Sequence, residues 1–174
     1  MPTTITSRNA RYQQWQALLT NRTKRQRTGE FLVHGVRPIT MAIEHGWKLR
    51  ALLHPTAGVR SRWAAAMLER VDAEHVAMAP ELLGELAEKV DEPPELVAVA
   101  EMAPDQLDRI PESPAQLVVA FDRPTSPGNV GTLVRSVDAF GGAGVIVTGH
   151  AADVYDPQGR ASKYRVVVRY PCRP

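Results

Sequence analysis

The stretch LVVAFDRPTSPGNVG, residues 117–131, decides the fold of the second half of the chain. Its first five residues are apolar, which is typical of a strand buried on both faces. A turn rich in Pro and Gly follows, and the spacing then predicts a helix over 130–140. The residues of this helix that should face the core are Val130, Leu133, Val134, Val137 and Phe140. A strand, a turn and a helix in this order are typical of a parallel α/β sheet.

The turn between this expected strand and helix contains the residues best suited to ligand binding or catalysis. In parallel sheets, ligands bind at the carboxyl ends of the strands, and glycines let a backbone approach them closely. Asn129 lies at the expected start of the helix, and Arg135 lies off its apolar stripe, so Arg135 could reach the mouth of a site. The same pattern is also consistent with a plainer interpretation, in which Asn129 is only a helix cap and Arg135 a solvated charge.

Upstream of this stretch, strand-like and helix-like segments alternate a second time. Strands are expected at 31–33, 49–53, 76–78 and 96–100, with helices over 8–19, from Pro38 to Gly46, 63–70 and 80–89. The alternation predicts a parallel sheet in each part. The proline-rich stretch 103–114 is expected to be a linker with one short helix, between a domain at 1–102 and another at 115–174. The second domain, with roughly 60 residues, is short for a self-sufficient α/β fold.

Charge is spread unevenly along the chain, although its formal net value is only +2. Residues 1–30 hold six Arg or Lys and one Glu, a net of +5, and residues 113–174 have a net of +3. Residues 81–112 hold ten acids and two bases, a net of −8. Basic regions at both ends suit a polyanionic partner, and the acidic middle should face away from it.

Several functional classes are disfavoured by composition. The single cysteine, Cys172, cannot form an internal disulfide, which suits a reducing, cytoplasmic location. The histidines at 45, 54, 75 and 150 lack metal-ligand spacing, so no metal is expected. No apolar run reaches the roughly 18 residues of a membrane span, so no membrane partner is expected.

Residues 121–141, FDRPTSPGNVGTLVRSVDAFG, resemble the first motif of the SpoU/TrmH RNA ribose methyltransferases. That family has Asn and Arg at the positions of Asn129 and Arg135. Residues 156–162, DPQGRAS, resemble its helical Arg-x-Ser segment. Residues 7–9, the basic run after it, 29–37 and 95–99 resemble the RNA-binding domain that often precedes the catalytic one. His34 stands where the family usually has Glu, and we interpret it as a local structural variation.

The resemblance implies an α/β chain of two parts. An N-terminal ribosomal-protein-like α/β RNA-binding domain would be followed by an incomplete SPOUT (trefoil-knot type) parallel α/β domain. The family's second and third motifs, whose loops form the knot and hold S-adenosylmethionine, belong C-terminal to residue 162. They are not found before Pro174. The expectation is therefore a truncated chain, in which no cofactor-binding residue can be named.

The function implied is transfer of a methyl group from S-adenosylmethionine to a ribose 2′-hydroxyl of tRNA or rRNA. Asn129 and Arg135 would be the catalytic residues, and the family suggests a homodimer. Two alternatives remain: a non-catalytic RNA-binding fragment that lacks the methyl-donor pocket, and a non-functional remnant. The basic run could also be a solvated turn, and Arg160 a surface ion-pair partner. The residues expected to bind RNA are Arg22, Lys24, Arg25, Arg27, Arg160 and Ser162.

Overall fold

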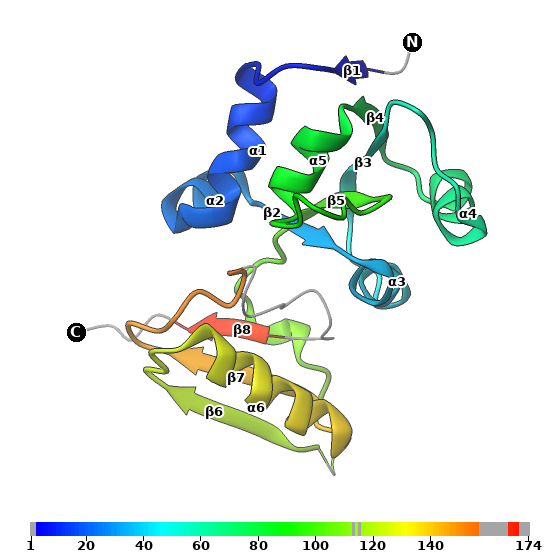
Figure 1. Ribbon diagram of the computed structural model, residues 1–174. Coiled ribbons are helices and arrows are strands. Elements are labelled where there is room, and N and C mark those ends of the chain that lie inside the picture. The colour runs from blue at the N-terminus through cyan, green and yellow to red at the C-terminus, as the bar shows by residue number, and fades with distance from the viewer. Residues whose placement is uncertain (1–2, 113, 115, 157–166, 171–174) are drawn as a thin grey trace. The chain divides into compact units, whose positions relative to one another are not determined.

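The computed structural model describes residues 3–112, 114, 116–156 and 167–170 (Figure 1). The chain divides into two compact units, Met1–Met102 and Ala103–Pro174. In the part of the chain described, no helix is both long and apolar enough to span a bilayer.

The first unit is built on a five-stranded sheet. Its strand order is β1 (Thr3–Ile5), β4 (Glu74–Met78), β3 (Leu49–Pro55), β5 (Val97–Glu101) and β2 (Glu30–His34). β1, β4 and β3 are parallel, but β5 runs antiparallel to both of its neighbours. The prediction of a parallel sheet is therefore wrong for this unit. The apolar run of β5 indicates burial on both faces, and burial does not encode strand direction.

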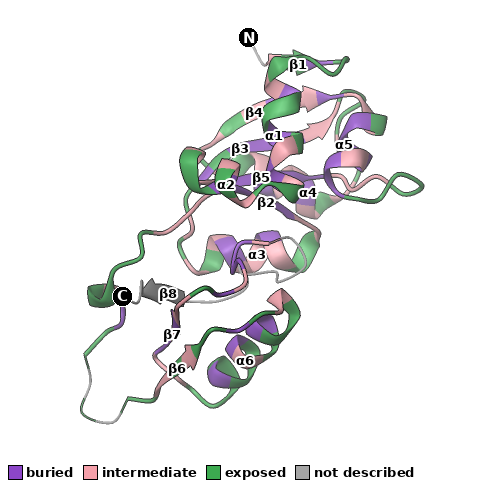
Figure 2. Cartoon of the chain, turned by 90° about the vertical axis from the view of Figure 1, so that its left-hand side faces the viewer, coloured by how far each residue is buried: buried purple, intermediate pink, exposed green. Residues whose placement is uncertain are grey.

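Helices cover both faces of this sheet. α1 (Ala10–Thr20) and α5 (Pro80–Leu86) pack on one face, where Trp15 and Leu83 meet Leu53 in the main core. Leu52 points to the opposite face because side chains alternate along a strand. On that face lie α3 (Val36–Glu44) and α4 (Arg62–Arg70). In Figure 2, β3, β5 and β2 carry most of the buried residues of this sheet.

Helix ends in this unit follow local capping chemistry. The side chain of Asn9 caps α1 by accepting from the backbone N–H of Tyr12 at 3.0 Å. Asn21 caps α2 (Arg22–Thr28) in the same way, and Gly29 ends this helix with a φ of 66°. The basic run is therefore a short helix, and not a turn.

The second unit holds the parallel sheet that the sequence predicts. Its order is β6 (Val118–Asp122), β7 (Gly144–Thr148) and β8 (Val167–Tyr170), and both pairings are parallel. The three arrowheads in Figure 1 point the same way, and α6 (Pro127–Ala139) lies along the sheet. All three strands therefore place their carboxyl ends at one edge.

Three details of this unit differ from expectation. β6 is only half-buried, as Figure 2 shows, because it is an edge strand in the described sheet. Phe140 follows the last residue of α6 and is 83% exposed, so it does not join the core. The stretch 103–114, expected to be a linker, packs onto the unit: Ile110 is 8% exposed and lies against Gly144. It includes the expected short helix, η1 (Leu107–Arg109).

Candidate functional site

The loop between β6 and α6 sets the position of Asn129. Ser126 is the N-cap of α6, and its hydroxyl accepts from the backbone N–H of Asn129 at 3.4 Å. Asn129 is therefore the third residue of the helix, and its interpretation as the cap is wrong. Its side chain is exposed, and within the described residues it has no hydrogen-bond partner. The Asn129 amide is thus available to a ligand.

Arg135 lies two turns further along the same helix. Its side chain is exposed, and its Nη2 donates to the Thr132 hydroxyl at 2.8 Å. Positions three apart are neighbours on a helix surface, so Asn129, Thr132 and Arg135 form a continuous polar line. Val130, Val134 and Val137 are buried on the opposite side. The prediction that Arg135 lies off the apolar stripe is confirmed.

A second group of polar side chains lies at the carboxyl ends of β6 and β7. Asp122 and Thr148 are partners in the strand register, and the Thr148 hydroxyl donates to Asp122 Oδ1 at 2.7 Å. Arg123 Nε donates to Asp122 Oδ2 at 2.7 Å. The hydrogen bond from Thr148, and then that from Arg123, lower the pKa of Asp122 below its usual range. Asp122 is therefore an anion at neutral pH.

Backbone hydrogen bonds join the two loops that follow these strands. The N–H of Arg123 donates to the Thr148 carbonyl at 3.0 Å, and the N–H of Ala152 donates to the Pro124 carbonyl at 2.6 Å. Gly149 adopts a φ of 69° between them. These hydrogen bonds therefore hold together the two loops at the carboxyl-end edge of the sheet, which is the edge where ligands bind in parallel sheets. Asp122 and Arg123 belong to the sequence motif of residues 121–141, but the pattern predicts no role for either of them, and Thr148 lies outside that motif.

The basic run of the first unit does not act as one surface. Arg25 is only 2% exposed, and its Nη1 donates to the carbonyls of Leu18 at 2.5 Å and Leu19 at 3.1 Å. Arg27 is exposed, while Arg22 and Lys24 are half-buried. Arg25 therefore ties α2 to the end of α1, and its burial argues against the predicted phosphate contact.

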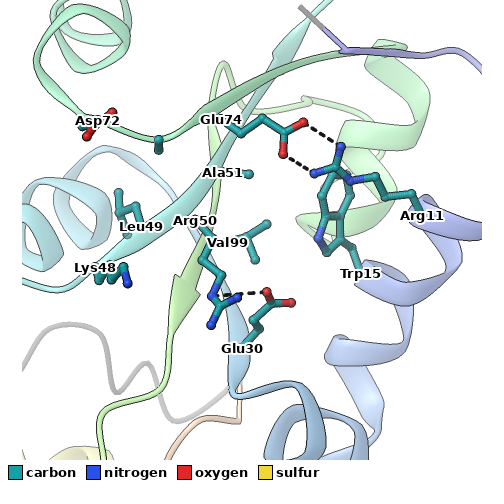
Figure 3. A pocket seen from close by; sticks show the side chains of 11 residues that line it. Arg11, Trp15, Glu30, Lys48, Leu49, Arg50, Ala51, Asp72, Glu74 and Val99 are labelled. Carbon is teal, nitrogen blue, oxygen red and sulfur yellow. Dashed lines mark hydrogen bonds and ion pairs between the residues drawn. The ribbon is translucent and has the colours of Figure 1, made fainter.

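A pocket of about 580 Å³ opens beside the strand starts of the first unit (Figure 3). Trp15, Ala51 and Val99 supply apolar lining. The charged residues at its rim are Arg11, Lys48, Arg50, Glu30, Asp72 and Glu74. Arg11 lies 4.8 Å from the centre of the Trp15 ring and forms a two-pronged ion pair with Glu74. The equal numbers of cations and anions make the pocket electrically balanced.

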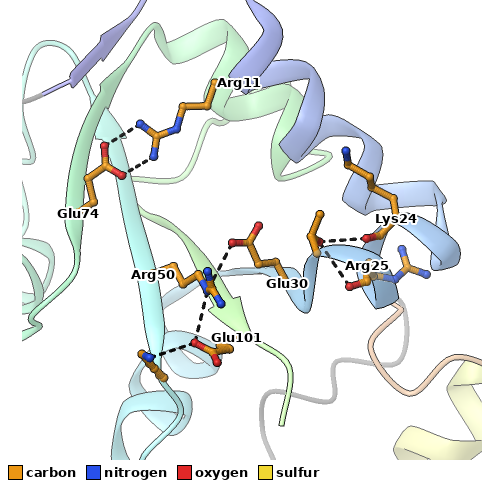
Figure 4. A network of polar contacts seen from close by, with 9 residues as sticks. Arg11, Lys24, Arg25, Glu30, Arg50, Glu74 and Glu101 are labelled. Atoms are coloured by element: carbon orange, nitrogen blue, oxygen red, sulfur yellow. Dashed lines mark hydrogen bonds and ion pairs between the residues drawn. The ribbon is translucent and has the colours of Figure 1, made fainter. Parts of the chain in front are cut away.

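Figure 4 shows how the remaining charges of this region are paired. Arg50 Nε lies 3.5 Å from Glu30 Oε1 and 3.4 Å from Glu101 Oε2. Lys48 Nζ lies 3.3 Å from the same Glu101 oxygen. Each of these cations faces a carboxylate, so the region offers little net attraction to a polyanion. We interpret it as an ion-pair network that joins β2, β3 and β5.

Two of the predicted RNA-binding residues, Arg160 and Ser162, lie outside the described residues. The Arg-x-Ser segment that contains them is therefore not placed relative to Asn129 or Arg135. In the described ranges, no three His, Cys, Asp or Glu side chains are grouped so as to hold a metal ion.

Comparison with known proteins gives these two polar groups a context. The SpoU L30e-like domain matches residues 9–98. A 23S rRNA (uridine(2479)-2′-O)-methyltransferase from Streptomyces viridochromogenes is 62% identical over 154 residues, which are 88% of this chain and 54% of that protein. The chain thus spans about half the length of that relative. It belongs to the SpoU family.

Solved structures agree with this assignment. The SpoU methyltransferase AviRb from Streptomyces viridochromogenes, in complex with AdoMet, has a TM-score of 0.86 and 57% identity over 94% of this chain and 64% of that one. An AdoMet-bound rRNA methyltransferase from Sinorhizobium meliloti has a TM-score of 0.79 and 25% identity over 98% of this chain and 65% of that one. The two-unit α/β architecture is therefore that of SpoU methyltransferases.

Proposed function

We propose that the protein is an RNA methyltransferase that transfers a methyl group from S-adenosylmethionine to a ribose 2′-hydroxyl of 23S rRNA. The observation that carries this proposal is the 62% identity to a 23S rRNA 2′-O-methyltransferase across 88% of the chain. The exposed line of Asn129, Thr132 and Arg135 on α6, the helix that follows the carboxyl end of β6, supports it. We propose that, within this activity, residues 9–98, which match the SpoU L30e-like domain, bind the RNA.

The chemistry needs positioning more than acid catalysis. S-adenosylmethionine supplies, when bound, an electrophilic methyl group and a neutral leaving group. The 2′-hydroxyl must be aimed at that carbon, so that its oxygen forms the new bond to carbon as the bond from sulfur breaks, and its proton must pass to solvent water. Arg135 binds the neighbouring phosphate and stabilises the developing alkoxide, while its bond to Thr132 fixes the side chain. Arg135 keeps its own proton, because a guanidinium does not lose it in proteins.

Asn129 is proposed to orient the ribose through its exposed amide, which both donates and accepts hydrogen bonds. Asp122 and Thr148 at the strand ends, with Asn129 in the first turn of α6, provide hydrogen-bonding groups of the kind that a nucleoside-type donor would need. The family's donor-binding loops belong C-terminal to residue 162, so we assign no donor contact to a particular residue. Arg22, Lys24 and Arg27 are proposed to contact phosphates.

We further propose that the active protein is a cytoplasmic homodimer. β6 is half-exposed at the edge of its described sheet, and Leu117 just before it is 47% exposed. An apolar strand edge of this kind is usually covered, and a second copy would cover it. Sedimentation equilibrium tests this part, since a monomer at all micromolar concentrations would contradict it.

The test of the activity is transfer of tritium from labelled S-adenosylmethionine to unmethylated 23S rRNA. Arg135→Lys keeps the charge but loses the planar fork, and we expect it to lower kcat by about 100-fold or more. Thr132→Val keeps the Arg135 guanidinium but removes its hydroxyl partner, so we expect a smaller decrease in kcat than in Arg135→Lys. An rRNA that stays unlabelled although the protein binds it would contradict catalysis and support the RNA-binding alternative. Full activity in Arg135→Lys would contradict the role of that residue.

A further inference from the structure

Arg123 adopts a backbone conformation that its residue type avoids. Its φ is 46°, and within the described part of the chain Glu88 is the other non-glycine residue with a positive φ. Glu88 lies just after α5, where left-handed residues are common, but Arg123 follows a strand. Glycine or asparagine would fit this position with less strain. Because the backbone gives no reason for arginine here, the reason must lie in its side chain.

The Arg123 side chain is held on two sides. Its Nε donates to Asp122 Oδ2 at 2.7 Å, and Thr148 fixes the other oxygen of that carboxylate at 2.7 Å. Its aliphatic stem crosses Gly149: a Cβ added there would lie 2.5 Å from Arg123 Cγ and 3.3 Å from Cδ. The stem therefore needs a glycine at 149. This bracing lowers the entropy that the side chain would lose when it binds a ligand.

The held guanidinium nevertheless faces solvent, since the Arg123 side chain is 74% exposed. A guanidinium is a planar fork of N–H donors, and in Arg123 the Nε of this fork donates to Asp122. The donors of an arginine match the oxygens of a phosphate in geometry better than the donors of any other side chain do. Arg123 lies at the ligand-binding edge of the parallel sheet, and α6, which carries Asn129 and Arg135, begins four residues later.

We propose that Arg123 is a substrate-positioning residue that binds an RNA phosphate near the target ribose, held in place by Asp122, Thr148 and Gly149. This inference rests on the proposed function and adds a residue to it. An RNA phosphate fits better than the carboxylate of S-adenosylmethionine because the side chain is mostly exposed at the edge of the sheet. RNA offers a phosphate at every nucleotide to such a position, whereas the donor carries one carboxylate.

The experiment measures binding of a fluorescent 23S rRNA fragment by anisotropy at several salt concentrations, and S-adenosylmethionine binding by calorimetry. Arg123→Gln should weaken RNA binding about tenfold and lower the slope of affinity against salt by about one unit. It should leave S-adenosylmethionine affinity unchanged. Arg109→Gln, in the same unit, makes the same charge change and should leave RNA affinity within about twofold.

Two further variants separate binding from folding. Arg123→Gly relaxes the backbone, so it should lose RNA affinity as Arg123→Gln does while its melting temperature stays the same or rises. Thr148→Val keeps Arg123 but removes the hydrogen bond from the Thr148 hydroxyl to Asp122. We expect this variant to lose about threefold in RNA affinity. In the transfer assay the Arg123 variants should raise KM for RNA more than they lower kcat.

The outcomes separate this inference from the proposed function. If the wild-type protein binds RNA and Arg123→Gln binds it with equal affinity and salt slope, the role of Arg123 is wrong and the function stands. A loss of S-adenosylmethionine affinity with unchanged RNA affinity would overturn the phosphate assignment in favour of the donor. If the wild-type protein binds no RNA, both the inference and the proposed function fail.

Discussion

At the scale of single residues, the same side-chain type serves opposite purposes in this chain. Arg25 and Arg27 lie two positions apart in α2, yet Arg25 is buried and bonded to two carbonyls while Arg27 is exposed. The last carbonyls of a helix lack partners within it, and Arg25 supplies a donor to those of α1. A run of basic residues in a sequence therefore does not establish a surface for nucleic acid.

Arg25→Met should lower the free energy of unfolding by about 1–3 kcal/mol, because the carbonyls of Leu18 and Leu19 lose a buried donor. Arg27→Met is the matched control and should change stability by less than about 0.5 kcal/mol. Urea denaturation of both variants measures the difference. Equal stability of the two would mean that the buried guanidinium contributes nothing to the fold.

Glu85 gives the first unit a pH-dependent contribution to stability. The hydrogen bond from Arg8, and then the hydrogen bond from Tyr12 at 2.5 Å, lower the pKa of its carboxyl. A group whose pKa is lower in the folded state contributes stability above its unfolded pKa, and the contribution disappears as pH falls through its folded pKa. Glu85→Gln should therefore flatten the acidic side of a plot of melting temperature against pH. A slope equal to that of the wild-type protein would contradict this account.

At the scale of elements, α6 shows how a helix can bury one face and leave the other for chemistry. Val130, Val134 and Val137 pack inward, and Asn129 and Arg135 remain in solvent. The apolar pattern extends one residue too far, since Phe140 lies beyond the last helical residue. Residues after a helix end no longer follow its periodicity.

Val134→Ala should therefore cost more stability than Phe140→Ala, although phenylalanine is the larger side chain. The buried valine loses two methyl groups of packing, about 1.5 kcal/mol, while the 83% exposed Phe140 should cost less than about 0.5 kcal/mol. Thermal melts of both variants decide the order. The reverse order would show that Phe140 is covered in solution.

Much of the secondary structure follows from sequence patterns, but other features depend on tertiary contacts. The apolar runs predict β2, β3, β5 and β6, and helical spacing predicts α1, α4, α5 and α6. β1, three residues long, is stabilised by pairing with β4 and is too short to give a pattern. The direction of β5 depends on chain connectivity, which apolar runs do not encode.

The candidate site also combines residues that the sequence motif predicts with contacts that depend on the tertiary structure. Asn129 and Arg135 could be found because they fall at fixed positions of a strand–turn–helix motif. The Asp122–Thr148 hydrogen bond joins residues 26 apart in sequence and depends on strand register. Neither the left-handed φ of Arg123 nor its packing against Gly149 has a local signal, because arginine does not favour that conformation.

At the scale of the whole molecule, the two units have separate cores. The main hydrophobic cluster lies within the first unit and joins α1 and α5 to its sheet. The core of the second unit includes Val134 of α6 and Val145 of β7. Ile110, from the segment that begins this unit, is buried as well. Separate cores let one unit be tested for folding by itself.

Residues 1–102, expressed alone, should fold cooperatively and bind rRNA more weakly than the whole chain does. The unit retains its five-stranded sheet and main cluster, and it loses only the phosphate contacts of the second unit. Circular dichroism melts test whether the fragment folds cooperatively, and fluorescence anisotropy tests how strongly it binds rRNA. A fragment that fails to melt cooperatively would show that its stability depends on the second unit.

The proposed activity is methylation of a ribose 2′-hydroxyl in 23S rRNA. The most direct measurement is mass spectrometry of nucleosides from unmethylated 23S rRNA incubated with the protein and S-adenosylmethionine, beside Arg135→Lys. We expect one new 2′-O-methylated nucleoside with the wild-type protein and a loss of about 100-fold in its rate of formation with the variant. A methyl group on a base, or unchanged rRNA that the protein nevertheless binds, would contradict it.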